Sequence, residues 1–233
     1  LGEVIDLLKE MGLEENTIVF FTGDNGGQDR FSSKKHPRGF FGPNVNPKNG
    51  VEFRGGKGNL YEGGLKIPFL VRWPGKVKAG TVSDLVFNQV DIFPTLTDLS
   101  ETKAPSDLDG ISVLKEILGH SDGQEQHEML YWEFGNQTAV RFGNWKAIEP
   151  NKVKNPGKWE LYDLSKDISE TKDVASDHPA ILDKMKVYAE GEHEGWVKGT
   201  YADPDRTLHE KDRAAKWGTA KPEPPKKKKK AKA

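Results

Sequence analysis

Cysteine is absent from the 233 residues. Its absence excludes disulfides, thiolate metal sites and a cysteine nucleophile, but it does not identify the cellular compartment, because many periplasmic proteins also lack cysteine. Long hydrophobic runs are absent too, and none approaches the roughly 18 residues that a membrane helix needs. The sequence therefore predicts a polar protein without a membrane span.

A large net charge is also lacking, since 35 Lys and Arg nearly balance 36 Asp and Glu and leave a net charge of −1. The last thirteen residues hold seven Lys and one Glu, a local charge of +6, so residues 1–220 carry −7. A general nucleic-acid binder should carry its basic surface on the folded part. We therefore expect no nucleic-acid partner, and we expect the Lys- and Pro-rich segment 201–233 to be a disordered tail.

The first residues carry a helical pattern. Apolar side chains recur at helical spacing and form one stripe, made of Leu1, Val4, Ile5, Leu7, Leu8 and Met11. Gly12 ends this predicted helix, and the continuous apolar run at 17–21 is typical of a buried parallel strand. A helix that begins at residue 1 without a cap indicates a preceding strand, so we interpret the chain as the C-terminal part of a longer protein.

Residues 23–64 are rich in Gly, Pro, Asn and charged residues and have little periodicity. A segment of about 40 residues without a clear element is too long for an ordinary connection, so we interpret it as a functional loop region. A second buried strand is predicted at 67–73, and helices are predicted at 90–99 and around 111–118.

The pattern changes near residue 120. Short strands are predicted at 129–134, 138–142, 145–148 and 159–162, with a hairpin turn at Gly143-Asn144, and a helix is predicted from Pro179 to about Glu194. The sequence thus predicts an α/β protein with three regions. These are an α/β domain at 1–120, a small antiparallel α+β subdomain at 121–200 and the tail at 201–233.

Polar residues directly after the first predicted strand form a candidate metal site. Ligands of open α/β sheets bind outside the carboxyl ends of the strands, where this sequence has Gly23-Asp24-Asn25-Gly26-Gly27. The Asp24 carboxylate and the Asn25 amide supply oxygens suited to Ca²⁺ or Mg²⁺. An Asx turn that closes the strand is the alternative, and two ligands fall short of the about six to eight that Ca²⁺ takes.

A glycine-rich block at 54–64, RGGKGNLYEGG, is the second candidate. A lysine in such a block, here Lys57, can bring its ammonium close to an oxyanion. The block is not a P-loop, because Gly58 follows the lysine in place of Ser or Thr, and a flexible solvated loop is the alternative. His36 is a weaker substrate-binding candidate, since its charged run at 34–38 also fits a solvated surface.

Five segments, in this order, resemble the formylglycine-dependent sulfatases of the alkaline-phosphatase-like superfamily. They read EENTIVFFTGDNG, GGKGNLYEGGLKIPFLVRWPG, VDIFPTLTDL, AVRFGNWKAI and WELYDLSKD, and they span roughly residues 1–165. The resemblance implies the C-terminal part of a mixed sheet flanked by helices. It also implies that Asp24 and Asn25 bind a divalent cation, usually Ca²⁺, and that Lys57 contacts the substrate sulfate and takes part in catalysis.

Two departures from the family pattern stand out. Lys66 occupies a position where the family commonly has Arg, so a point charge replaces a planar, bidentate group. The family's nucleophile is a formylglycine made from Cys or Ser in a C/S-x-P-x-R motif, and the sequence has no such motif. We therefore expect the nucleophile and the remaining metal ligands upstream, and we expect this chain alone to be inactive.

The resemblance implies that the intact protein hydrolyses a sulfate ester of an aryl or carbohydrate substrate, in the periplasm or outside the cell. Sulfated polysaccharides, glycosaminoglycans and small aryl sulfates all fit. One alternative is a phosphoester or phosphonate hydrolase of the same superfamily, which an upstream unmodified Thr or Ser nucleophile would indicate. The other is a non-catalytic, truncated chain that folds or binds without turnover.

Overall fold

The computed structural model describes residues 1–28 and 44–195. Leu1–Glu192 form one compact unit, and a second unit begins at His193. The predicted tail at 201–233 lies outside the described residues.

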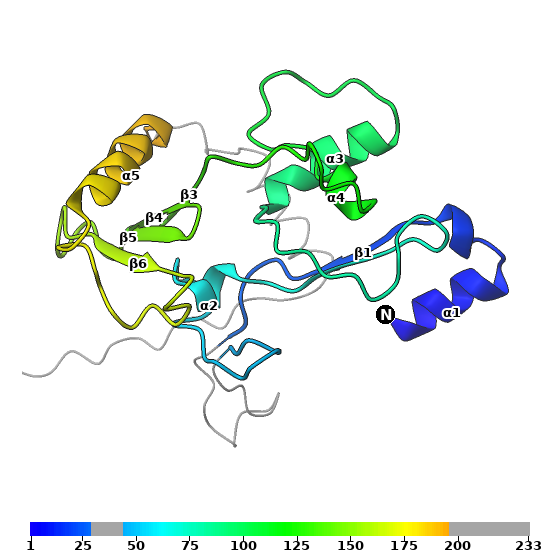
Figure 1. Ribbon diagram of the computed structural model, residues 1–233, viewed down its shortest axis with the longest axis horizontal. Helices are drawn as coiled ribbons and strands as arrows, with labels where there is room; N and C mark the ends of the chain where they lie inside the picture. Colours follow the sequence, from blue (N-terminus) through cyan, green and yellow to red (C-terminus); the bar gives the residue numbers. More distant parts are fainter. Residues whose placement is uncertain (29–43, 196–233) are drawn as a thin grey trace, which may run out of the picture. The chain divides into compact units, whose positions relative to one another are not determined.

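Short helices and strands follow one another along the chain (Figure 1). They are α1 (Gly2–Glu10), the 3-10 helix η1 (Glu14–Asn16), β1 (Val19–Thr22), α2 (Glu62–Leu65), β2 (Phe69–Arg72), the 3-10 helix η2 (Gln89–Asp91), α3 (Ile92–Leu99), α4 (Leu114–Ile117), β3 (Met129–Phe134), β4 (Gln137–Phe142), β5 (Trp145–Glu149), β6 (Glu160–Asp163) and α5 (Pro179–Glu192). Among the residues described, no helix combines the length and apolarity needed to cross a membrane.

Helix α1 confirms the predicted N-terminal helix. Gly12 follows it with φ +67°, a left-handed conformation that glycine adopts without the steric cost of a Cβ and that commonly ends helices. No residue of α1 is buried, and its apolar stripe is largely exposed. The described residues therefore leave this apolar face mostly uncovered.

Strands β1 and β2 pair with each other, and their direction corrects the prediction of a parallel strand. The pairing is antiparallel, with Thr22 opposite Phe69. The prediction of burial is wrong as well, because no residue of either strand is fully buried, and Phe21 and Leu70, which lie opposite each other, are 43% and 57% exposed. An apolar run carries no information on strand direction, and a sheet of two strands has little other structure to cover it among the described residues.

Strands β3 to β6 form one antiparallel sheet in sequence order. Phe142 lies opposite Trp145, so the β4–β5 hairpin closes with the two residues Gly143-Asn144, as predicted. Gly143 has φ +55°, which a tight hairpin turn of this kind requires. The sheet and α5 confirm the small α+β arrangement, while its boundary at residue 120 stays a prediction.

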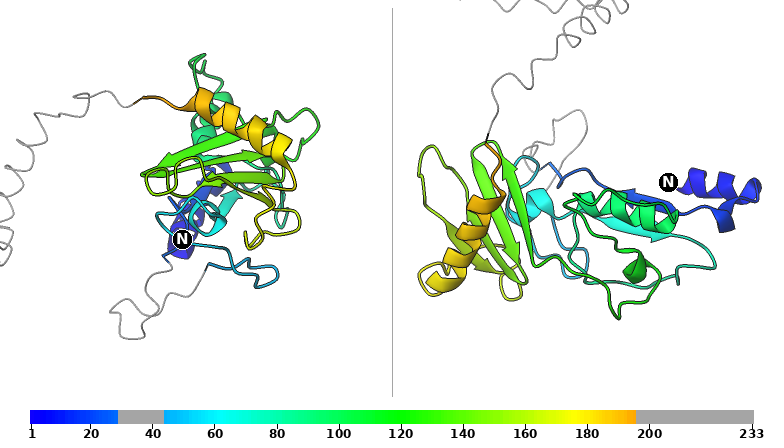
Figure 2. Two further views of the ribbon diagram at one scale, coloured as in Figure 1. Left: turned by 90° about the vertical axis from the view of Figure 1, so that its left-hand side faces the viewer. Right: turned by 90° about the horizontal axis from the view of Figure 1, so that it is seen from above.

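Helix α5 covers one face of this sheet (Figure 2). The buried side chains at this contact are Met129, Val140, Ala147 and Leu161 from the strands and Leu182, Met185 and Ala189 from the helix. They bury the apolar positions of every strand on that side, which favours folding in proportion to the apolar area removed from water.

The opposite face of the same sheet is covered by the glycine-rich block. Successive residues of a strand point to opposite faces, so the neighbours of the α5-facing residues form a second buried cluster. Its strand members are Ala139, Ile148 and Tyr162, and Leu60 and Tyr61 of the block pack against them. This packing fixes the block at 54–64 on the sheet.

Candidate functional site

Strand β1 ends at Thr22, and Asp24 and Asn25 follow shortly after it, as predicted. Asp24 is exposed and Asn25 is half-buried. The Asn25 Nδ2 donates a hydrogen bond of 3.0 Å to the Gly26 carbonyl, which orients the amide and leaves its oxygen to serve as a ligand. In the described ranges no group of three or more His, Asp or Glu could hold a metal ion, and the metal role of Asp24 and Asn25 stays a prediction.

Backbone hydrogen bonds join the Asp24–Asn25 turn to the glycine-rich block. The Gly26 amide donates to the Gly64 carbonyl at 2.8 Å, and the Lys57 amide donates to the Gly27 carbonyl at 2.9 Å. Two segments that the sequence indicated separately therefore lie side by side. The structure thus brings the backbone of Lys57 next to the turn that carries the predicted metal ligands.

The close approach of these segments requires glycine. A Cβ added to Gly26 would overlap the Gly63 carbonyl, and one added to Gly63 would overlap the Gly55 carbonyl. Backbone atoms cannot rotate away as a side chain does, so these positions exclude larger residues. Asn44 completes the contact, because its Nδ2 donates to the Gly27 carbonyl at 3.0 Å and to the Gly63 carbonyl at 2.8 Å.

The Lys57 side chain is exposed. Its ammonium is thus available to a ligand, while its backbone is fixed by the contact with Gly27. Lys66, at the position where the family commonly has Arg, places its Nζ 5.7 Å from the centroid of the Phe53 ring. His36, the weaker substrate-binding candidate, lies outside the described residues.

A buried cluster of three charges joins Glu62 of the block to Lys146 and Glu170, and sequence reasoning missed it. Lys146 and Glu170 are fully buried and Glu62 is 4% exposed. The Lys146 Nζ donates to Glu62 Oε1 at 2.9 Å and lies 2.8 Å from Glu170 Oε1. Glu170 Oε2 accepts a hydrogen bond of 2.6 Å from the Glu62 backbone amide, at the start of α2. The Lys146 ammonium therefore lies within ion-pair distance of two carboxyl groups.

The two carboxyl groups of this cluster have opposite pKa shifts. Burial acts to raise the pKa of Glu62, but the Lys146 ammonium outweighs it and holds that pKa below its usual range. Burial prevails at Glu170 and raises its pKa, because Lys146 offsets it only in part. Of the two carboxyl groups beside Lys146, the ionised form is therefore favoured at Glu62 and the neutral form at Glu170.

Arg54, at the start of the block, contacts a second polar group on the sheet. Its Nη1 donates to the Tyr162 hydroxyl at 2.7 Å, and its guanidinium lies 3.9 Å from the centroid of the Tyr61 ring. Both tyrosine hydroxyls donate to Glu160 Oε2, at 2.8 Å from Tyr61 and 2.6 Å from Tyr162. Burial first, and then the Glu160 carboxylate, raises the pKa of both tyrosines, so they remain neutral donors.

Asp91, predicted near the start of a helix, is fully buried. Its carboxylate accepts hydrogen bonds from the Asn88 and Ile111 amides, and Oδ1 lies 2.8 Å from His127 Nε2. His127 also lines a cavity of about 400 Å³. Neither Asp24 nor Lys57 lines that cavity, so it is separate from the candidate site.

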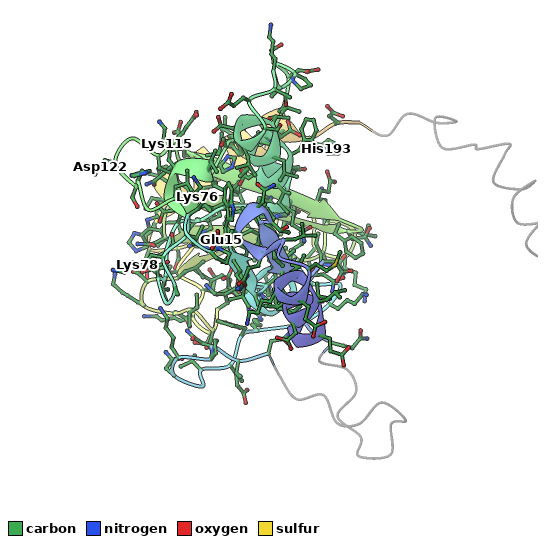
Figure 3. The ribbon with its side chains drawn as sticks, turned by 90° about the vertical axis from the view of Figure 1, so that its right-hand side faces the viewer. Glu15, Lys76, Lys78, Lys115, Asp122 and His193 are labelled. Carbon is green, nitrogen blue, oxygen red and sulfur yellow. The ribbon has the colours of Figure 1, made fainter. Side chains whose placement is uncertain are left out.

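Several other charged side chains of the described residues face solvent. Lys76, Lys78, Lys115 and Asp122 are exposed on the side of the molecule shown in Figure 3. Exposed charges of this kind contribute little to stability. The buried charges around Lys146, like the buried Asp91, therefore differ from these surface charges.

Two family models match the chain. The model described as "N-sulphoglucosamine sulphohydrolase, C-terminal" matches residues 56–190, which is more than half of the chain, and the model described as "Sulfatase" matches residues 1–102.

Curated relatives are named as sulfatases. The N-acetylgalactosamine-6-O-sulfatase of Bacteroides thetaiotaomicron is 34% identical over 200 residues, which cover 79% of this chain and 38% of the relative. The steryl-sulfatase of Mus musculus is 35% identical over 150 residues, covering 64% of this chain and 23% of the relative. The chain thus spans about two fifths or less of the length of these relatives.

Solved structures agree with this match. A Bacteroides thetaiotaomicron protein described in connection with the metabolism of multiple glycosaminoglycans is 30% identical, with a TM-score of 0.62 over 82% of this chain and 41% of that one. A sulfatase from Pseudoalteromonas is 25% identical, with a TM-score of 0.60 over 82% of this chain and 39% of that one.

Proposed function

The chain belongs to the sulfatase family, and from this premise we propose that its residues form part of an enzyme that hydrolyses sulfate esters. The observation that carries the proposal is the backbone contact between Gly27 and Lys57, at 2.9 Å. It joins the turn of the predicted metal ligands to the loop of the predicted substrate lysine. A sulfuryl group held between them would meet positive charge on two sides, which stabilises the charge that develops during transfer.

Asp24 and Asn25 would hold a divalent cation, Ca²⁺ or Mg²⁺. Their carboxylate and amide oxygens are of the type that such hard cations prefer, and the hydrogen bond from Asn25 Nδ2 to Gly26 leaves the amide oxygen for this purpose. When bound, the cation would supply Lewis-acid charge at the sulfate oxygens. The proposal assigns its other ligands to residues outside those described.

Lys57 would hold its ammonium against an oxygen of the substrate sulfate. Its exposed side chain leaves the amine accessible, and its backbone bond to Gly27 limits how far the amine can move. The proposal assigns the formylglycine nucleophile to residues outside these 233, since none of them forms the modification motif. The family match does not favour a phosphoester hydrolase.

The proposed substrate is a sulfated carbohydrate or an aryl sulfate. Relatives at about a third identity are named for N-acetylgalactosamine 6-sulfate and for steryl sulfate, which supports the ester class and leaves the particular ester to experiment. A periplasmic or extracellular location is included in the proposal, and cell fractionation tests it.

The test replaces Lys57 in the complete enzyme that contains these residues, matured by the formylglycine-generating enzyme. We expect Lys57→Ala to lower kcat/KM for an aryl sulfate roughly 100- to 1000-fold, the usual effect of losing one group that stabilises developing charge, without lowering Tm. Lys48→Ala is the matched control, because Lys48 is an exposed lysine in a neighbouring loop, and it should retain full activity. Unchanged turnover in Lys57→Ala would refute the role.

A further inference from the structure

The glycine-rich block is held by side chains from the β3–β6 sheet and the segment after it. Gln137, at the start of β4, binds the block at two points. Its Nε2 donates to the Gly58 carbonyl at 3.0 Å, and its Oε1 accepts from the Leu60 amide at 3.2 Å. These two contacts lie directly after Lys57, so a single side chain restrains the backbone that carries it.

Glu170 binds the block on both sides of Lys57. Its backbone carbonyl accepts a hydrogen bond of 3.0 Å from Arg54 Nη1, and its side chain accepts one of 2.6 Å from the Glu62 amide. Glu170 itself has φ +54°, a conformation that costs a residue with a Cβ about 1 kcal/mol or more. The surrounding contacts therefore hold Glu170 in an unfavourable backbone conformation, which is typical of a residue fixed for a specific contact.

Lys146 completes the restraint from the centre of the sheet. Full burial of an ammonium costs free energy of folding. Apolar residues of similar volume that replace a buried ion pair often give a protein of equal stability. A buried ion pair instead permits only one arrangement, because any displacement leaves a charge without its partner. The Lys146–Glu62 contact therefore fixes the position of α2 and of the glycine-rich block, whose last residues belong to α2.

We propose that Gln137, Lys146 and Glu170 are positioning residues, which hold the glycine-rich block so that Lys57 stays beside the Asp24–Asn25 turn. The proposal rests on the proposed role of Lys57. None of the three residues needs to touch substrate. The β3–β6 sheet thereby acts on catalysis through the geometry of a loop that precedes it in the sequence.

Hydrogen exchange on the 233-residue chain tests the restraint independently of catalysis. Gln137→Ala should speed amide exchange across residues 54–64 roughly five- to tenfold, the effect of losing a hydrogen bond in a locally opening segment, while α5 stays unchanged. Gln126→Ala, an exposed glutamine that precedes the same sheet, is the control and should change neither. Unchanged exchange in 54–64 would overturn the proposal.

A double-mutant cycle in the complete enzyme separates positioning from general stability. Gln137→Ala should lower kcat/KM roughly 10- to 100-fold, because small misplacements of a catalytic group have effects of this size. In a Lys57→Ala background it should cause no further loss. Equal losses in both backgrounds would show a merely structural role and overturn the proposal.

Variants of Glu170 supply a second measurement, which does not depend on a stable Lys146 variant. Glu170→Gln keeps an acceptor for the Glu62 amide and should retain most activity. Glu170→Ala removes the acceptor and should lower kcat/KM by about as much as Gln137→Ala does. Equal activity of the two would contradict the positioning role. A fully active Lys57→Ala enzyme would refute the proposed function instead, and the exchange experiment would still decide whether the block is restrained.

Discussion

At the scale of single residues, the main buried charged feature between the glycine-rich block and the β3–β6 sheet is the Lys146 ammonium, which lies close to two carboxyl groups. Lys146 pairs with Glu62 and approaches Glu170, all three buried. The lowered pKa of Glu62 means that folding favours its ionised form, and the raised pKa of Glu170 means that folding favours its neutral form. The two groups therefore make the stability of the fold depend on pH in opposite directions.

Replacement of Glu62 should reveal the first of these dependences. The contribution of a group with a lowered pKa is present above its ordinary pKa of about 4.3 and is lost as the pH falls through the lowered value. We expect Glu62→Gln to reduce the free energy of unfolding by about 1–3 kcal/mol at pH 7, and by less at pH 3. Urea unfolding of the variant and of the unmodified protein at pH 7 and pH 3 measures these differences in the free energy of unfolding.

Glu170→Gln is the matched comparison for that experiment. Ionisation of a group with a raised pKa costs stability as the pH rises past its ordinary value. The unfolding free energy of the Glu170→Gln variant, relative to the unmodified protein, should therefore improve between pH 3 and pH 7, opposite to that of Glu62→Gln. Parallel pH trends in the two variants would contradict the assignment.

At the scale of elements, the contact between the Asp24–Asn25 turn and the block depends on glycines that touch backbone. Gly63 lies in α2, where glycine is otherwise unfavourable by roughly 1 kcal/mol relative to alanine. The space around it explains why glycine occupies the position, since a Cβ would overlap the Gly55 carbonyl.

Alanine substitution of two helical glycines should therefore have opposite effects. Gly63→Ala should reduce the free energy of unfolding by about 1–3 kcal/mol, the usual cost of overpacking. Gly191→Ala in α5, where nothing lies within 4 Å of the added Cβ, should leave stability unchanged or raise it by up to about 1 kcal/mol. Thermal unfolding of both variants checks the pair, and equal shifts in Tm would contradict the packing argument.

The exposed face of the β1–β2 sheet should promote self-association of this chain. Phe21 and Leu70 lie opposite each other and are both exposed, and strands with an apolar face are sites of aggregation. We expect Phe21→Thr/Leu70→Thr to lower self-association in sedimentation experiments while changing the unfolding free energy by less than about 1 kcal/mol. Val187→Thr, at an exposed valine of α5, is the control. Association unaffected by the double substitution would contradict this expectation.

Local signals in the sequence predicted most elements, because periodicity and turn residues act over a few positions. The strands at 129–134 and 145–148 agree with β3 and β5 to within one residue, and the Gly143-Asn144 turn is confirmed. The antiparallel direction of β1 and β2 was missed, since strand direction depends on the path of the intervening chain. An apolar run is the same in either direction.

The candidate site was predictable only in part. The resemblance indicated Asp24 and Lys57, and the structure brings their segments together through backbone contacts. The buried cluster was missed because Lys146 and Glu170 lie 84 and 108 positions from Glu62 in the sequence. One signal was available, since Lys146 shares a strand face with the apolar Ile148, where a charged residue indicates a buried partner.

At the scale of the whole molecule, the chain contains the predicted metal ligands and the predicted substrate lysine but no formylglycine motif. It spans about two fifths of the sulfatase of Bacteroides thetaiotaomicron, and the modification motif is not among its residues. We expect the 233-residue chain alone to show no turnover of an aryl sulfate with added Ca²⁺, because covalent transfer needs an activated nucleophile. Turnover that disappears in Lys57→Ala would contradict this expectation.

The contacts of the glycine-rich block also limit how such proteins can recombine. Glu62 lies on one side of the segment 66–128, and Lys146 and Glu170 lie on the other. A crossover within that segment would join the block of one parent to the β3–β6 sheet of another, and a mismatch would leave a buried charge unpaired at a cost of about 3–5 kcal/mol. Chimeric proteins should therefore fold where both parents carry the same three charged residues, or where the exchanged segment includes all of residues 54–170.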